Sequence, residues 1–261
     1  MKDLKRILSN QKAELDAIDL ENLCSRKEEQ EIQLNSKLAQ IVIGVRRSGK
    51  STLCMKVLMQ SGVHFAYVNF DDERLQKVGV DELDVILQEL YAIYGSFTHL
   101  FLDEVQNVDG WHLFVNRLLR QGIKLVLTGS NANLLSGELS THLTGRYHQI
   151  ELYPFSFGEY CAIKGVDVQG QTTKAYGLRD QALDEYLVNG GFPELTALPE
   201  ISKRDYLFSL REAIVKKDIC QRYKLRYKQT LSDLANRLLD WFCQEKSYND
   251  IARVMSINSV H

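Results

Sequence analysis

The sequence predicts an α/β fold with a mainly parallel sheet flanked by helices, and two patterns in its 261 residues support this prediction. Short apolar runs of β-type residues recur at intervals, at residues 41–44, 64–70, 99–102 and 123–128. Helical apolar spacing separates them, at residues 52–60, 81–94 and 111–120. Strands that alternate with helices indicate a parallel sheet with both faces covered.

The flanking segments differ from this core. Residues 1–35 carry apolar residues among many charges, which predicts one or two amphipathic helices that pack on the core. Residues 147–152 are expected to add a last strand. Beyond Pro154 the pattern is helical, at residues 156–163, 180–189, 202–222 and 231–246. We therefore expect a core at 36–155, a helical region at 156–230 and a further helical segment at 231–261.

Residues 44–51, Gly-Val-Arg-Arg-Ser-Gly-Lys-Ser, match the phosphate-binding pattern G-x-x-x-x-G-K-[ST] at every fixed position. An apolar run precedes this loop and a helical pattern follows it, which is the context that the motif requires. Lys50 can reach the β- and γ-phosphates, and the Ser51 hydroxyl can ligate Mg²⁺. The residues expected to contact nucleotide are Gly44, Arg46, Arg47, Ser48, Gly49, Lys50, Ser51 and Thr52.

Two carboxylates end the apolar run at residues 98–102. Asp103 is placed to hold Mg²⁺, directly or through water, and Glu104 to orient and deprotonate an attacking water. An exposed strand end can also be acidic by chance, but these carboxylates follow an intact phosphate loop. Asp103 and Ser51 are thus the expected metal ligands, and Lys50 and Glu104 the expected catalytic residues.

The next predicted strand ends in Gly129-Ser130-Asn131. Either Ser130 or Asn131 could hydrogen-bond the γ-phosphate or the attacking water from this position. A plain Gly-Ser-Asn turn is the alternative.

Composition narrows the classes of function. The formal net charge is −2, so a nucleic-acid surface would have to be a local basic patch. The five cysteines are scattered, which suits reduced thiols in a cytoplasmic protein. The sequence shows no signal peptide, no apolar run long enough for a membrane span, and no histidine in metal-ligand spacing.

Other nucleotide motifs do not fit. Residues 135–138, Leu-Ser-Gly-Glu, look like the signature of transporter-type ATPases, but that signature precedes the Asp-Glu strand, whereas here it follows. The chain also lacks the Asp-x-x-Gly and Asn-Lys-x-Asp patterns of GTPases at the matching places. Adenine is favoured by elimination.

The chain resembles prokaryotic ATPases of the AAA+ superfamily, in the group whose core is followed by a winged-helix region and a C-terminal domain of unknown function. Four segments carry the resemblance: residues 44–52; residues 102–111; residues 128–130 with 143–146 and 152–160; and residues 186–194. The resemblance implies an ATP-hydrolysing core with a small helical lid. It also implies Ser130 as the sensor of the γ-phosphate and Arg146 as an arginine finger, for which a surface salt bridge is the alternative. It leaves the lid's phosphate-contacting arginine open among Arg179, Arg204 and Arg211.

Residues 247–260 resemble the start of a helix-turn-helix, with Ser247 as N-cap. The family pattern would continue through a wing, so we expect residues 231–261 to be a partial winged helix with an incomplete DNA-reading surface.

These features predict an enzyme that hydrolyses ATP to ADP and phosphate with Mg²⁺, as a switch or motor on a macromolecular partner, protein or DNA. We expect it to act away from membranes, and a homo-oligomer is one possible arrangement. The alternatives are a switch that binds ATP with negligible turnover and a DNA-binding regulator with ATP as effector. A small-molecule kinase is a weaker one, because Asp103 and Glu104 favour water as the nucleophile.

Overall fold

The computed structural model describes residues 3–21, 23–130, 143–221, 226 and 228–255. The chain divides into two units, Met1–Pro199 and Glu200–His261, and each is described by itself. The first unit holds the sheet and the phosphate loop.

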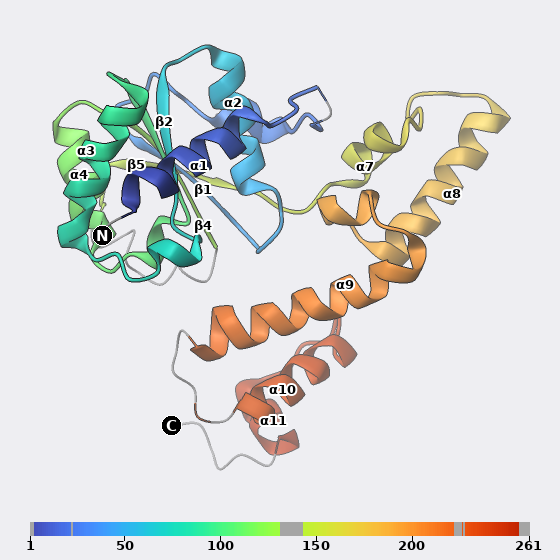
Figure 1. Ribbon diagram of the computed structural model, residues 1–261. Helices are drawn as coiled ribbons and strands as arrows, with labels where there is room; N and C mark the ends of the chain where they lie inside the picture. The colour runs from blue at the N-terminus through green and yellow to red at the C-terminus, as the bar shows by residue number, and fades with distance from the viewer. Residues whose placement is uncertain (1–2, 22, 131–142, 222–225, 227, 256–261) are drawn as a thin grey trace. The chain divides into compact units, whose positions relative to one another are not determined.

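Five parallel strands form the sheet (Figure 1). The strands are β1 (Ala39–Gly44), β2 (Phe65–Asn69), β3 (His99–Asp103), β4 (Lys124–Ser130) and β5 (Tyr147–Glu151). Their order across the sheet is β2-β3-β4-β1-β5. Gly44 is level with Ser130, so the strand that leads into the phosphate loop runs beside β4. The predicted α/β fold with a parallel sheet is confirmed.

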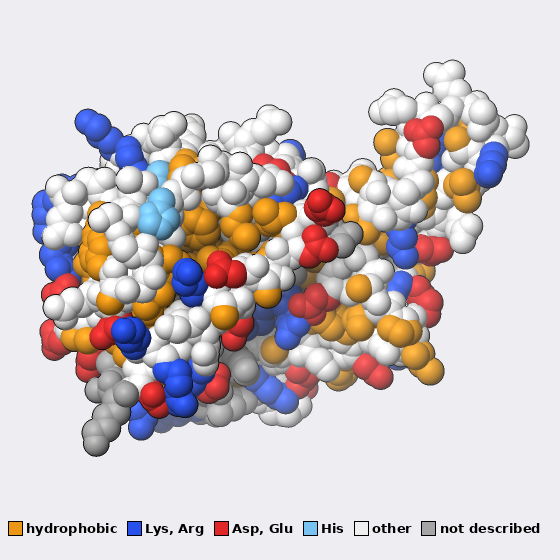
Figure 2. Space-filling model, turned by 45° about the horizontal axis from the view of Figure 1, so that its top comes forward, with side chains coloured by type: hydrophobic (Ala, Val, Ile, Leu, Met, Phe, Trp, Pro, Cys, Tyr) orange, Lys and Arg blue, Asp and Glu red, His pale blue; other side chains and the backbone are white. Residues whose placement is uncertain are grey.

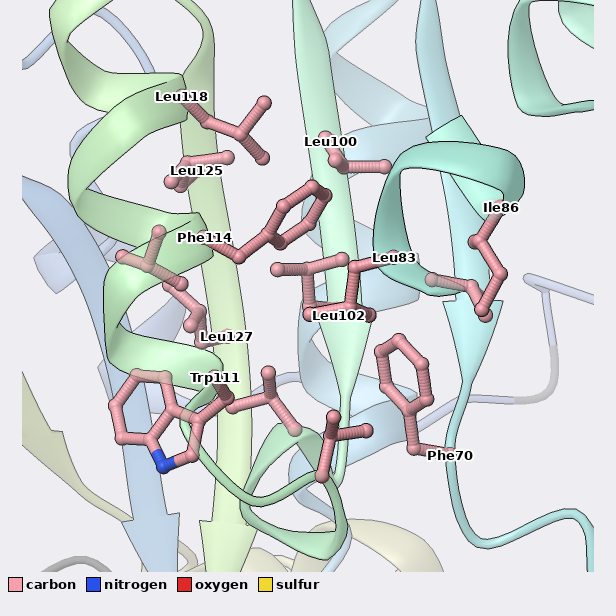
Figure 3. Close-up of a cluster of buried hydrophobic side chains, with 14 of the residues drawn as sticks. Phe70, Leu83, Ile86, Leu100, Leu102, Trp111, Phe114, Leu118, Leu125 and Leu127 are labelled. Carbon is pink, nitrogen blue, oxygen red and sulfur yellow. The ribbon is translucent and has the colours of Figure 1, made fainter. Parts of the chain in front are cut away.

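Alternate residues of the strands face two separate cores, as the two-residue period of a strand requires. On one face, Leu100 and Leu102 pack with the apolar sides of α3 (Leu83–Tyr94) and α4 (Trp111–Arg120), and Figure 3 shows this cluster. Residues Leu4, Ile7 and Leu8 of α1 (Leu4–Asp16) join the same core. Because apolar side chains are buried on both faces of the sheet, burial of apolar surface is the main source of stability for this fold.

The opposite face of the sheet packs against α2. Val42 and Phe101 lie in this second core with Leu53, Cys54 and Leu58 of α2 (Lys50–Ser61). The short helix η1 (Lys27–Glu31) ends beside the same core, where Ile32 is buried. The remaining short helices are η2 (Glu73–Leu75), η3 (Val80–Glu82), η4 (Val105–Asn107) and η5 (Pro193–Thr196).

Two helices follow the sheet in the first unit, α7 (Phe157–Lys164) and α8 (Thr173–Asn189). The sequence predicts a start near residue 180 for the second of them, and this prediction is wrong by several residues. Gly177 lowers helix propensity and masks the pattern. The Thr172 side chain nevertheless accepts a hydrogen bond from the Ala175 N–H at 3.1 Å, which caps the helix seven residues earlier than predicted.

The second unit is helical. It contains α9 (Glu200–Ala213), the π-helical segment η6 (Ile214–Gln221), α10 (Lys228–Asp240) and α11 (Tyr248–Val254). The change to π-helical geometry at Ile214 divides what the sequence predicts as one helix. Ser247 caps α11, as predicted, by accepting from the Asp250 N–H at 3.2 Å. Residues 256–260 of the predicted helix-turn-helix lie outside the described part of the chain.

Acidic and basic side chains are intermixed on the face drawn in Figure 2, in keeping with the small net charge. Among the residues that the structure describes, none of the helices combines the length and the apolar character that crossing a membrane requires.

Candidate nucleotide site

The backbone of the phosphate loop is fixed by its glycines. Gly49 has a φ of 94°, which side chains with a Cβ rarely adopt, and it is the residue before α2 begins. A Cβ on Gly44 would lie 2.1 Å from the Leu152 carbonyl oxygen, so only glycine fits where the loop leaves β1. The loop therefore delivers its N–H groups and the amino end of α2 to the carboxyl edge of the sheet.

Lys50 carries the positive charge of this loop. Its side chain is buried, its Nζ donates to the Val45 carbonyl at 3.1 Å, and it lies 3.8 Å from Oε1 of Glu104. The first N–H groups of α2 have no partner within the helix and add partial positive charge at the same place. Lys50 and the helix end together form a site for an anion.

Asp103 is the most connected side chain of the site. Its carboxylate accepts hydrogen bonds from the Ser51 hydroxyl at 2.8 Å, from the Tyr67 hydroxyl at 3.3 Å and from the Thr128 hydroxyl. These donors come from α2, β2 and β4, so one carboxylate at the end of β3 joins three other elements. The hydroxyl of Ser51 and the carboxylate of Asp103 are oxygen ligands of the kind that Mg²⁺ prefers.

Glu104 turns away from the strand that precedes it. Its φ of 52° is in the left-handed region, and its N–H donates to the Thr128 hydroxyl at 3.0 Å. Its carboxylate accepts from the Gln106 side chain and faces Lys50. The strained backbone at this residue thus brings the carboxylate beside the phosphate loop.

A cavity of about 340 Å³ collects these groups at the carboxyl edge of the sheet. The structure brings eight of the predicted residues to its walls: Arg46, Arg47, Gly49, Lys50, Ser51, Thr52, Asp103 and Glu104. Gly44 and Ser48 belong to the loop beneath, where Ser48 is fully buried.

Four further residues line this cavity and escaped the sequence prediction: Asn69, Asp71, Pro193 and Glu194. Asn69 is the last residue of β2 and Asp71 follows two residues later, so polar residues at the end of a predicted strand were a usable signal for both. Pro193 packs on Gly49, with its Cγ 3.7 Å from where a Cβ of Gly49 would be. Glu194 accepts from Nη1 of Arg47, at 2.7 and 2.5 Å.

A second cavity, of about 310 Å³, adjoins the first and is more apolar. Gly49, Thr52, Pro193 and Glu194 line both. The other walls of the second cavity are Leu23, Cys24, Arg26, Leu53, Lys56, Phe155, Ile163 and Thr196. The more apolar lining of this space suits an aromatic base next to a phosphate site.

Two predicted residues are not seen at the cavity. Ser130 ends β4 level with Gly44, but its side chain, like all of Asn131, lies outside the described part. Arg146 is not among the cavity's lining residues. It donates to the Asn116 side chain at 3.0 Å and lines a separate cavity of about 610 Å³ with Arg117 and Arg120.

Burial changes the acidity of Asp103. The pKa of its carboxyl is raised from 3.8 to about 6, mainly because burial removes it from water, and the nearby charge of Glu104 acts in the same direction. The hydrogen bonds from Thr128 and Ser51 and the charge of Lys50 act in the opposite direction. Because the folded protein binds this proton more tightly than the unfolded chain does, Asp103 lowers stability as pH rises from about 4 to about 6.

Replacing Asp103 with Asn removes this buried charge. We expect Asp103→Asn to raise the free energy of unfolding at pH 7.5, without nucleotide or metal, by up to about 3 kcal/mol. The gain should disappear at pH 4, where Asp103 itself is protonated. Urea unfolding at both pH values measures this, with exposed Asp180→Asn as control; an equal effect at both pH values would contradict the shifted pKa.

Comparison with known proteins agrees with this geometry. A family described as an AAA domain matches residues 36–161, which include the phosphate loop and the Asp103–Glu104 strand end. An uncharacterized protein of Methanocaldococcus jannaschii is 33% identical over 232 residues, and one of Haemophilus influenzae is 36% identical over 208 residues. These matches cover 86% and 77% of this chain but 52% and 50% of the relatives. The chain thus spans about half the length of the curated relatives it matches.

Among solved structures, similarity is found to a Walker-type ATPase of Pyrococcus abyssi, at 16% identity and a TM-score of 0.48, over 90% of this chain and 89% of that one. AMPPCP-bound DnaA from Aquifex aeolicus gives 14% identity and a TM-score of 0.45, over 90% and 78%. The family match, the strand order and the phosphate loop agree with one another, and residues 36–161 are an AAA domain of the P-loop type.

Proposed function

We propose that the chain binds ATP with Mg²⁺ and hydrolyses it to ADP and phosphate, as a switch or motor on a macromolecular partner. The observation that carries the proposal is the cavity at the carboxyl edge of the sheet. The phosphate loop, the buried Lys50 and two carboxylates in different surroundings, Asp103 and Glu104, all line this cavity. A site of this composition suits transfer of a phosphoryl group to water.

The donor set fits the metal. Ser51 Oγ and Asp103 Oδ1 lie 2.8 Å apart, so a small cation could be held by either oxygen, directly or through water. Ser51 and Asp103 would hold Mg²⁺ there, and the metal would supply positive charge against the negative charge that develops during phosphoryl transfer. Lys50 and the amino end of α2 stabilise the β- and γ-phosphates from the other side.

Glu104 is the residue proposed to accept the proton of the attacking water. Its carboxylate faces the Lys50 amine, so it lies within reach of the γ-phosphate position. The adjoining apolar cavity is the proposed place for adenine, because Gly49 and Thr52 line both spaces and one nucleotide could therefore occupy the two. Ser130 remains the proposed sensor of the γ-phosphate from the end of β4.

We expect Lys50→Ala to weaken ATP binding by about 10- to 100-fold, because it removes a charged donor to the phosphates. Isothermal titration calorimetry with Mg²⁺ present measures this. Lys37→Ala, which removes an exposed lysine outside the cavity, is the matched control and should bind as wild type does. Unchanged affinity in Lys50→Ala would remove the basis of the proposal.

Glu104→Gln separates binding from turnover. Glutamine keeps the size of the side chain and can still accept from Gln106, but it cannot take a proton. We expect ATP to bind normally while release of phosphate falls by about 10²-fold or more. Hydrolysis at the wild-type rate would exclude Glu104 as the base, whereas wild type without turnover would favour a nucleotide-binding switch.

Arg146 is proposed as a finger that completes the site of a second copy. It lies away from the cavity of its own chain, between the α4 region and β5. We expect Arg146→Ala to lower turnover but not ATP binding, and more strongly than Arg120→Ala, which alters the same separate cavity. Mixing Arg146→Ala with Glu104→Gln should partly restore activity, because some interfaces would then hold both intact residues. A mixture as inactive as its components would argue against a shared site.

A further inference from the structure

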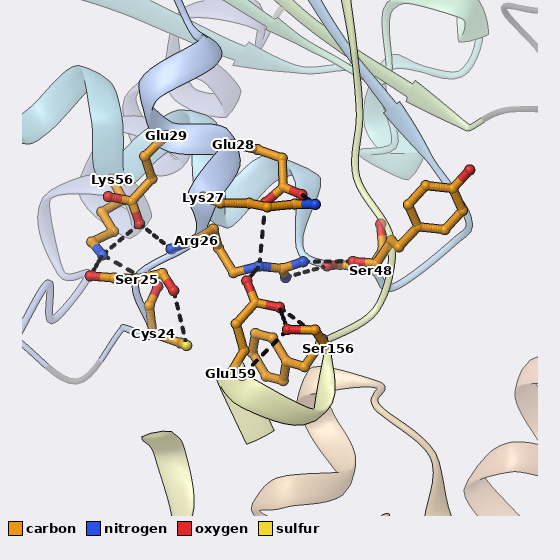
Figure 4. Close-up of polar contacts among 12 residues, drawn as sticks. Cys24, Ser25, Arg26, Lys27, Glu28, Glu29, Ser48, Lys56, Ser156 and Glu159 are labelled. Atoms are coloured by element: carbon orange, nitrogen blue, oxygen red, sulfur yellow. Dashed lines mark hydrogen bonds and ion pairs between the residues drawn. The ribbon is translucent and has the colours of Figure 1, made fainter. Parts of the chain in front are cut away.

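Arg26 is a buried side chain whose guanidinium reaches three segments that lie far apart in the sequence (Figure 4). Its Nε donates to Oε1 of Glu159 in α7 at 2.6 Å. Its Nη2 donates to the Tyr153 carbonyl at 2.7 Å, and its Nη1 to the Ser48 carbonyl at 3.5 Å. Ser48 belongs to the phosphate loop, so one charge links this loop to the chain after β5 and to α7.

The guanidinium also contacts the wall of the apolar cavity. Its central carbon lies 4.8 Å from the centre of the Phe155 ring, in a cation–π contact. Phe155 lines that cavity and donates its N–H to the Gly191 carbonyl at 2.7 Å. Arg26 therefore supports both the space proposed for the base and the loop proposed for the phosphates.

The backbone that carries Arg26 is itself held in place. The Nζ of Lys56, in α2, donates to the Cys24 carbonyl at 3.3 Å, to the Ser25 hydroxyl at 3.0 Å and to the Glu29 carboxylate at 2.8 Å. Glu29 in turn accepts from the Arg26 N–H at 2.7 Å. The backbone at residues 24–26, before η1, is thus held against α2, the helix that follows the phosphate loop.

Glu159 has two tasks in this cluster. Besides pairing with Arg26, its carboxylate accepts from the Ser156 N–H at 2.8 Å and from the Ser156 hydroxyl at 2.7 Å, which caps the first turn of α7. Without Arg26, the Glu159 carboxylate and the carbonyls of Tyr153 and Ser48 would each lose a hydrogen-bond donor. Because these groups are poorly hydrated, the loss is costly. The local structure is therefore expected to shift rather than to keep its shape.

We propose that Arg26 is a positioning residue for the nucleotide site. It holds the phosphate loop through the Ser48 carbonyl, and the Phe155 wall and α7 through its other contacts, in a single arrangement. Nucleotide affinity then depends on Arg26 through these neighbours, in addition to its own place in the wall of the apolar cavity. The effect on affinity rests on the proposed function, whereas the effect on the loop does not.

The test compares Arg26→Gln and Arg26→Lys with a control at the opposite end of the sheet. His99 is equally buried, and its Nε2 is bonded to the Leu34 carbonyl at 3.0 Å, at the amino end of β3. His99→Gln thus cuts a buried connection to the N-terminal segment without touching the cavity. Hydrogen exchange without nucleotide and ATP titration are both measured at a temperature where every variant is folded.

In Arg26→Gln we expect faster amide exchange in residues 44–51 and 153–160 and ATP affinity lowered about 10-fold or more. Arg26→Lys should show a smaller change of the same kind, because one amine cannot replace the three-way fork. His99→Gln should lower the melting temperature at most, with loop exchange and affinity unchanged. The proposal would be overturned if amide exchange at residues 44–51 and ATP affinity were the same in Arg26→Gln as in His99→Gln.

Two further outcomes are distinguishable. If wild type fails to bind ATP while Arg26→Gln still loosens residues 44–51, the proposed function fails and the positioning role stands. If Arg26→Gln does not fold, Glu159→Gln takes its place, since it keeps the shape and removes only the charge of the partner. Faster exchange at residues 44–51 in Glu159→Gln then supports the proposal, and wild-type exchange there overturns it.

Discussion

The site depends on a carboxylate that is buried where parallel strands end. Because every strand of the sheet runs in the same direction, the carboxyl ends of β1, β3 and β4 meet at one edge, and Asp103 lies among them. The cost of burying its charge is partly offset by hydrogen bonds from Ser51 and Thr128, and Tyr67 also donates to it. The same bonds attach α2, and with it the phosphate loop, to two neighbouring strands. A change at this carboxyl therefore alters the stability of the fold and the chemistry of the site together.

The charges around the cavity are arranged so that an anion can enter. Lys50 lies 3.8 Å from Glu104, and Arg47 and Glu194, which both line the cavity, form a direct ion pair at 2.5 Å. The Arg47–Glu194 pair is half exposed, so it contributes at most about 1 kcal/mol and is readily replaced by a contact with phosphate. The buried groups, by contrast, keep their places through hydrogen bonds to the backbone and to Asp103. The buried groups of the site are thus fixed, whereas the exposed Arg47–Glu194 pair can rearrange when an anion binds.

The part of the site that is local in sequence could be predicted from the sequence. Residues 44–51 and 103–104 are short, continuous and adjacent to apolar runs, and the parallel order of the strands brings them together. Pro193 and Glu194 could not be placed in the same way, because their position depends on how distant segments pack. Arg26 is the extreme case: it opens residues 26–31, of which all but Gln30 are charged, a pattern typical of an exposed helix. Its burial follows from partners more than a hundred residues away, Tyr153 and Glu159.

The most direct test of the central claim is a crystal structure of the chain grown with a non-hydrolysable ATP analogue and Mg²⁺. The triphosphate should lie along residues 44–51, with the metal at Ser51 and the Lys50 amine against the β- and γ-phosphates. The base should occupy the apolar cavity beside Phe155 and Pro193. An analogue bound at any other place, with the phosphate loop left as it is here, would contradict the assignment of this cavity as the nucleotide site.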